Sequence, residues 1–135
     1  MPREGILQLK IGCGTDIIEI NRIKHSIEEF GEAFINTIFT EKEVKYCESK
    51  KNSKFQHYAA RFAAKEAIYK AISNCNEKIK ANFLDAEIIN SKNGKPKVVF
   101  LNELSYLNQA EIDISISHCK EYAIAMVIII TQEEK

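Results

Sequence analysis

One candidate for chemistry is Asp16, a carboxylate that follows the segment Gly12-Cys13-Gly14-Thr15. The two glycines permit a tight turn, which leaves Asp16 where a strand gives way to a loop. A carboxylate in such a place is a candidate catalytic or metal-binding group. It is also a candidate turn former or helix cap, and this segment alone favours that structural interpretation.

A second candidate is the segment 61–71, which reads RFAAKEAIYKA. At about 100° per residue, its alanines gather on one side of a helix and allow close packing. Arg61 falls beside Lys65 and Glu66 beside Lys70, with two aromatic residues between the pairs. Charges next to buried aromatic rings are costly unless each has a partner, and a metal ion bound to a polyphosphate would partner both signs. The alternative is a surface helix with an ordinary Glu66–Lys70 pair.

The third candidate lies at the end of a predicted strand, where Ser115 and Ser117 share one face and His118 is the last residue. A histidine there can form structural hydrogen bonds, donate to a phosphate or transfer protons. Cys119 has no evident orienting partner, which disfavours covalent catalysis. The three segments together indicate metal-assisted chemistry on a phosphate compound, and the residues alone do not name the substrate.

The first half of the chain should position Asp16 and the 61–71 segment. Alternation at residues 7, 9 and 11 predicts a strand that ends in the 12–16 segment. A helix is expected from about Glu19, with an apolar stripe formed by Ile20, Ile23, Ile27 and Phe30. Capping boxes at 40–43 and 53–56 predict two further helices, the second of which should reach about Ser73.

The second half is rich in strand patterns. The runs 86–89 and 97–101 flank Asn93-Gly94, a strong hairpin signal. A short helix is expected at 102–108, a half-buried strand at 112–117, and a more fully buried partner strand at 122–130. This order predicts a single α+β domain over residues 1–135, with a largely antiparallel sheet packed on helices.

Composition excludes several classes of protein. Lys+Arg and Asp+Glu both total 19, and this zero net charge argues against a nucleic-acid or membrane-surface binder. The longest apolar run, 123–130, is far shorter than the roughly 20 residues that span a bilayer, and no signal peptide is evident. The four cysteines lack metal-ligand spacing. We therefore expect a soluble, cytoplasmic protein with reduced thiols.

Taken together, the segments resemble the holo-[acyl-carrier-protein] synthases, the small bacterial-type branch of the 4′-phosphopantetheinyl transferases. The matching pieces are GTDI at 14–17 with Glu19 and Arg22-Ile23, Phe39-Thr40 with Glu43, RFAAKEA at 61–67 with Lys70-Ala71, NGKP at 93–96 and ISISH at 114–118. They occur in the family's order and at its spacing across nearly the whole chain.

The resemblance implies transfer of the 4′-phosphopantetheine group of coenzyme A to a serine of apo-acyl carrier protein, with release of 3′,5′-ADP, in support of fatty acid biosynthesis. Asp16 and Glu66 would ligate Mg²⁺, and Lys70 would complete the catalytic set. Coenzyme A would be the co-substrate, and the residues expected to bind it are Arg61, Lys65, Lys70, Gly94, Pro96, Ser117 and His118.

The resemblance also implies partners. The family is typically a homotrimer with active sites between subunits, so that Asp16 and Glu66 could come from different chains. Arg22 and Lys24 are the expected docking residues for the carrier, although three glutamates at 28, 29 and 32 would weaken steering of an acidic partner. Where the family usually carries glycines after Ala71, this chain has Ser73-Asn74-Cys75-Asn76, which predicts a differently shaped phosphate loop.

Two rival functions stay open at this point. One is a Mg²⁺-dependent hydrolase of a nucleotide pyrophosphate, in which water replaces the carrier serine. The other is a non-catalytic binder of coenzyme A or of a carrier protein. The joint presence of Asp16, Glu66 and Lys70 argues against the second rival, and transfer to an apo-carrier would exclude both.

Overall fold

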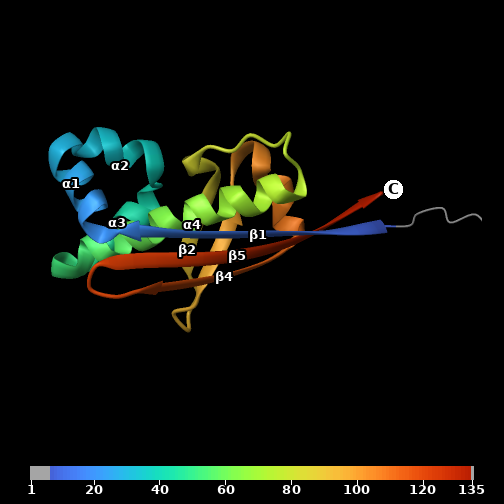
Figure 1. Cartoon of the computed structure of the whole chain (residues 1–135). Helices are drawn as coiled ribbons and strands as arrows, with labels where there is room; N and C mark the ends of the chain where they lie inside the picture. The colour runs from blue at the N-terminus through green and yellow to red at the C-terminus, as the bar shows by residue number, and fades with distance from the viewer. Residues whose placement is uncertain (1–6, 135) are drawn as a thin grey trace, which may run out of the picture.

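The computed structural model describes residues 7–134 (Figure 1). Its elements are β1 (Leu7–Glu19), α1 (Ile20–Phe30), α2 (Glu32–Ile38), α3 (Glu41–Ser49), η1 (Lys51–Ser53), α4 (Lys54–Cys75), η2 (Phe83–Asp85), β2 (Ala86–Asn90), β3 (Pro96–Phe100), η3 (Asn102–Gln109), β4 (Glu111–His118) and β5 (Tyr122–Glu134). The predicted α+β fold is confirmed, and every strand pair is antiparallel. The predicted domain bounds, 1–135, extend past the described residues at both ends.

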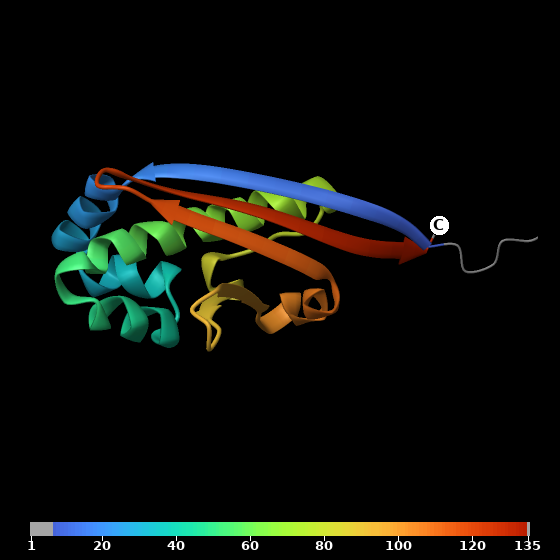
Figure 2. The same cartoon turned by 90° about the horizontal axis from the view of Figure 1, so that it is seen from below.

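The strands form a three-stranded sheet in the order β1-β5-β4 and a separate β2–β3 hairpin. In the large sheet Asp16 pairs with Ala125, and His118 pairs with Ala123. The long helix α4 lies along one face of this sheet, and the β2–β3 hairpin and η3 lie on the same side of the sheet (Figure 2). None of the helices formed by the described residues lies on the opposite face of the sheet (Figure 2).

The glycines of β1 serve close packing, which corrects the predicted turn at 12–16. β1 continues as a strand to Glu19, and both glycines face α4. A Cβ added at Gly14 would collide with the backbone carbonyl of Ala67, and one at Gly12 with that of Ala71. The absence of these Cβ atoms lets β1 approach the alanine face of α4. Asp16 therefore sits inside a strand, pressed toward the helix.

The helices follow the apolar pattern with two corrections. The capping box at Thr40 and Glu43 is present, but Ser53 makes no cap bond, because its hydroxyl donates to the Lys50 carbonyl instead. The helix α2 was not predicted; it follows Gly31, whose φ of 59° ends α1. Phe30 is exposed rather than part of the buried stripe of α1.

β5 is buried on one face only, which corrects the prediction of a more fully buried strand. Its inward residues are Ala123, Ala125, Val127 and Ile129. Large apolar side chains on the other face of β1 and β5 are exposed: Ile11, Ile17, Ile124, Met126 and Ile128. None of the helices between residues 7 and 134 combines the length and apolar character of a membrane span.

Candidate active site

Asp16, Glu66 and Lys70 lie together on one flank of α4. Asp16 points from β1 toward the helix, and Lys70 Nζ lies 3.2 Å from Asp16 Oδ1 and 3.0 Å from the Thr15 carbonyl oxygen. Burial raises the pKa of the Glu66 carboxyl, the neighbouring Asp16 carboxylate raises it further, and the Lys70 ammonium opposes both. Both acids belong to one chain, so neither has to come from a second subunit.

The donor set of this flank suits Mg²⁺. Two carboxylates that lie side by side are stabilised by a shared cation. Within residues 7–134, no group of three or more His, Cys, Asp or Glu side chains could hold a metal ion. The protein would therefore supply two oxygen ligands, and phosphate oxygens and waters would supply the rest. Mg²⁺ is typically bound in this shared manner.

The other flank of α4 carries a cluster of cationic and aromatic groups around Arg61. The guanidinium stacks 4.0 Å from the Tyr46 ring centroid, and Nη2 donates to Asn90 Oδ1 at 2.7 Å. The ring centroids of His57 and His118 lie 5.9 Å apart. Arg61 Nε is buried and has no hydrogen-bond partner among the described residues. None of the contacts just described pairs the Arg61 guanidinium or the two histidine rings with a carboxylate. These nitrogen donors therefore form a site suited to an anion.

The hairpin turn joins this second flank through Asn90, whose Nδ2 donates to the Gly94 carbonyl at 3.0 Å. Gly94 has φ 83°, a conformation that favours glycine. Pro96 begins β3 directly after the turn. Burial lowers the pKa of His57, and Arg61, Lys50 and His118 lower it further.

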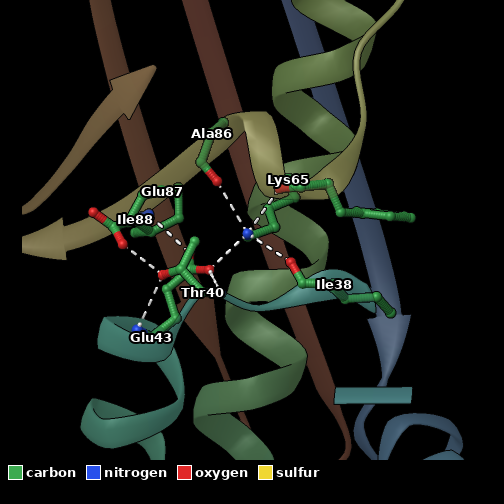
Figure 3. A network of polar contacts seen from close by, with 8 residues as sticks. Ile38, Thr40, Glu43, Lys65, Ala86, Glu87 and Ile88 are labelled. Carbon is green, nitrogen blue, oxygen red and sulfur yellow. Dashed lines mark hydrogen bonds and ion pairs between the residues drawn. The ribbon is translucent and has the colours of Figure 1, made fainter. Parts of the chain in front are cut away.

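The ammonium of Lys65, an expected coenzyme ligand, is surrounded by oxygen atoms of the protein, and its role toward the coenzyme stays a prediction. Its ammonium lies 2.6 Å from Glu43 Oε1 and donates to the carbonyl oxygens of Ile38, Phe83 and Ala86 (Figure 3). Lys65 is 3% exposed. Four oxygen partners leave this ammonium no donor for a phosphate, because it has only three N–H bonds.

Within one chain, the predicted site residues form two separate groups. One contains Asp16, Glu66 and Lys70, and the other surrounds Arg61 and His118. Arg61 and Glu66 are five residues apart on α4, which separates their side chains by about 140°, and Arg61 and Lys70 are about 180° apart. Ser117 belongs to neither group, because it is exposed on the sheet face that points away from α4.

Some features of the site were not visible in the sequence. His57 precedes Arg61 by four residues, a spacing that could have indicated a shared helix face. Nothing in the sequence linked Tyr46 or Asn90 to Arg61. Residues 73–75, where the sequence predicts a phosphate loop of different shape, belong to α4, which continues to Cys75. The Ser73 hydroxyl there donates to the Tyr69 carbonyl within the helix.

Comparison with known proteins places this arrangement in a family. Residues 12–127 match the model of the 4′-phosphopantetheinyl transferase superfamily. The holo-[acyl-carrier-protein] synthase of Ruminiclostridium cellulolyticum is 46% identical over 120 residues, which cover 86% of this chain and 89% of that protein.

Solved structures give the same result. The holo-(acyl-carrier-protein) synthase of Bacillus anthracis, solved in complex with CoA (3′,5′-ADP), has a TM-score of 0.73 at 35% identity and covers 92% of this chain and 99% of its own. The Helicobacter pylori enzyme, solved with coenzyme A, has a TM-score of 0.71 at 31% identity and covers 87% of this chain and 98% of its own. The chain therefore belongs to the 4′-phosphopantetheinyl transferase superfamily and, within it, to the holo-[acyl-carrier-protein] synthases.

Proposed function

We propose that this enzyme transfers the 4′-phosphopantetheine group of coenzyme A to a serine of apo-acyl carrier protein, depends on Mg²⁺, releases 3′,5′-ADP, and supports fatty acid biosynthesis in the cytoplasm. The observation that carries the proposal is the grouping of Asp16, Glu66 and Lys70 in a chain whose relatives were solved with coenzyme A. The free cysteines at 13, 47, 75 and 119 fit a reducing compartment.

Asp16 and Glu66 would hold the metal, which when bound would neutralise charge on the pyrophosphate of coenzyme A. Lys70, half exposed beside Asp16, would donate to a phosphate oxygen and stabilise the negative charge of the departing 3′,5′-ADP. The serine oxygen forms a bond to the phosphorus that carries pantetheine as the bond to 3′,5′-ADP breaks. Glu66 can take the serine proton at a carboxylate oxygen, directly or through a water.

Arg61, His118 and the turn at Gly94 and Pro96 would bind the adenosine end of the coenzyme. This role is supported by the unpartnered Nε of the buried Arg61 and by the exposed position of His118 beside His57. Since this group lies on the far flank of α4 from Glu66, a single coenzyme would be shared between two subunits.

The proposed assembly is a homotrimer with its active sites between subunits. The large apolar side chains on the bare sheet face support it: Ile17 is 62% exposed, Ile124 42% and Met126 49%. Exposed apolar patches of this kind mark interfaces. A neighbouring copy on this face would both cover the patch and present its own Arg61 group near the Asp16 group.

Carrier docking is proposed at the first half of α1. Arg22 and Lys24 are exposed there, and Lys24 Nζ lies 5.5 Å from the Phe55 ring centroid. Glu28 and Glu29 occupy the second half of the same helix. An acidic carrier helix would be attracted to the first half and repelled by the second.

The test is the intact mass of an apo-acyl carrier protein after incubation with the enzyme, coenzyme A and Mg²⁺, beside a sample with a chelator. A metal-dependent gain of one phosphopantetheine mass is expected. Consumption of coenzyme A without that gain would indicate a pyrophosphate hydrolase. Binding of coenzyme A with neither consumption nor gain, across several carriers, would indicate a non-catalytic binder.

A further inference from the structure

A cavity of about 290 Å³ adjoins Glu66 on the flank of α4 that carries the acidic pair. One wall is the helix, through Ile68, Tyr69 and Ile72, and the other is the segment 81–83 with Phe83. Its size is at the lower limit of small-molecule sites, about 300–1,000 Å³. A cavity of this size suits one part of coenzyme A, such as the slender pantetheine arm, better than the whole molecule.

The position of the cavity beside Glu66 is where the structure of the substrate would require the pantetheine arm to lie. In the proposed function, the phosphate that reacts lies beside Glu66, and the pantetheine arm is attached to that same phosphate. The arm must therefore leave the acidic pair in the direction of some neighbouring surface. Glu66 lines the cavity, and the lining is mostly apolar, which suits the hydrocarbon segments between the hydroxyl and the two amide groups of the arm.

The outer wall of this cavity is held by the ammonium of Lys65. Lys65 Nζ donates to the Ala86 carbonyl at 3.0 Å (Figure 3). It also donates to the Phe83 carbonyl at 2.9 Å, and both Phe83 and Ala86 line the cavity. The Phe83 ring stacks on Phe62 of α4, with centroids 5.5 Å apart. The segment 81–86 contains only a single short helical turn, so these contacts define where it lies against α4.

Lys65 is itself fixed by Glu43. Glu43 is fully buried, and its two oxygens accept from the Thr40 N–H at 2.9 Å and the Ile88 N–H at 2.8 Å as well as from Lys65. A buried ion pair contributes little net stability compared with apolar residues of the same shape, because both charges lose their hydration. Its geometry, in contrast, is specific. This pair locates the cavity wall relative to the helix that bears Glu66.

We propose that Glu43 and Lys65 are positioning residues for the reaction: they hold the segment 81–86 at the distance from α4 that forms a binding cavity for the pantetheine arm. The proposal rests on the proposed function, because it needs coenzyme A as the substrate. Neither residue touches the reacting atoms. Their effect is on the affinity for the arm.

The test compares two ligands that differ only by the arm. Coenzyme A and adenosine 3′-phosphate 5′-diphosphate share the nucleotide and both phosphates of its pyrophosphate. The dissociation constant of the second divided by that of coenzyme A, measured by titration calorimetry on the full chain with Mg²⁺, therefore reports the contribution of the arm. In Lys65→Met and in Glu43→Gln this ratio should fall by about tenfold or more toward one. The affinity for adenosine 3′-phosphate 5′-diphosphate should stay unchanged.

A double variant, Glu43→Leu with Lys65→Met, separates positioning from stability. It replaces both charges by apolar groups and removes the unpaired charge that could unfold a single variant. It should fold and still show the reduced ratio. An unchanged ratio, or an equal loss of affinity for both ligands, would overturn the proposal.

The wild-type protein distinguishes this proposal from the function on which it rests. If it transfers phosphopantetheine but binds coenzyme A no better than adenosine 3′-phosphate 5′-diphosphate, the cavity proposal is wrong and the proposed function stands. If it binds neither ligand and transfers nothing, both are wrong.

Discussion

At the residue scale, the charge of Asp16 affects the protonation of the neighbouring Glu66. Asp16 pairs with Lys70, and Glu66 has a raised pKa because burial and Asp16 both disfavour its charged form. The residue types indicated metal-assisted chemistry on a phosphate compound, and the family resemblance implied that these three residues act together. Their proximity in one chain came only from the pairing of β1 with α4.

Asp16→Asn and Glu66→Gln should each lower the transfer rate by about 10²- to 10³-fold, because each removes an anionic metal ligand from the developing charge. Both substitutions keep the side-chain shape, so the circular dichroism spectrum and the size of the assembly should not change. The measurement is the rate of carrier mass gain at saturating Mg²⁺. Near-normal turnover in either variant would contradict the metal assignment.

His57 should make stability depend on pH. Its pKa is lowered from the ordinary 6.5 by burial and by the cations Arg61 and Lys50, with His118 adding to the effect. The unfolded chain therefore takes up the proton first as pH falls. The free energy of unfolding is therefore at its full value above pH 6.5, where His57 is neutral in both states. It decreases as the pH falls from 6.5 toward the lower pKa that His57 has in the folded protein.

His57→Phe should lose less stability than the wild type between pH 7.5 and about 5.5, as measured by urea unfolding at each pH. The matched control is His25→Phe, because His25 is exposed on α1. A pH dependence that is the same in wild type and His57→Phe would show that another group is responsible.

At the scale of elements, the contact between β1 and α4 determines the acidic site. Gly14→Ala should destabilise the fold by about 2–3 kcal/mol or more, since the new Cβ would meet the Ala67 backbone, which cannot rotate away. The loss would also displace Asp16, two residues along the strand, and reduce transfer. Denaturant unfolding measures the first effect and carrier mass gain the second.

The control for Gly14→Ala is Cys13→Ala, because Cys13 is the adjacent residue of β1 and faces the exposed side. It should change stability by no more than about 0.5 kcal/mol. If the two variants were equally stable, β1 and α4 would not be packed as closely as the structure shows.

The helix α1 has its own prediction, because its charges are divided along its length. Lys24→Glu should raise the KM for an acidic carrier by about threefold to tenfold and leave the KM for coenzyme A unchanged, since it removes an attractive charge from the docking surface only. The control is Lys42→Glu on α3, which is also exposed. Equal effects on both substrates would argue against docking at α1.

At the scale of the whole molecule, α4 separates the acidic group around Asp16 from the coenzyme group around Arg61 and His118. In an active site formed between two subunits, the acidic group of one subunit would face the coenzyme group of the other. Co-expression of Asp16→Asn subunits with His118→Ala subunits should therefore restore activity that neither variant has alone. In randomly mixed assemblies, about a quarter of the sites would combine the intact acidic group of one subunit with the intact coenzyme group of another. The measurement is specific activity of the purified mixture.

Absence of rescue would mean that each site is complete within one chain. A further variant provides the control. Adding Met126→Asp to both subunits places a charge on the apolar sheet face, which should separate the subunits in sedimentation and abolish the rescue.

Much of the fold could be predicted from the sequence, because its signals are local. Alternation at 112–117 and the Asn93-Gly94 turn report backbone geometry over a few residues, and both predictions are confirmed. Thr40 and Glu43 formed the expected cap for the same reason. The errors lie where a local pattern has two uses: the Gly12 and Gly14 pair suits a turn as well as a close approach between elements, and an apolar run like 122–130 suits a buried strand as well as an interface strand.

The sequence by itself determined the family, the kinds of element and the residue types of the acidic group. Only the tertiary structure decided which charges meet. Lys65 and Glu66 are neighbours in sequence, yet α4 turns one into the core, where Glu43 and three carbonyls hold it, and the other toward Asp16. The physical reason is that a helix directs successive side chains about 100° apart, so the role of each charge depends on which distant segment packs against that face.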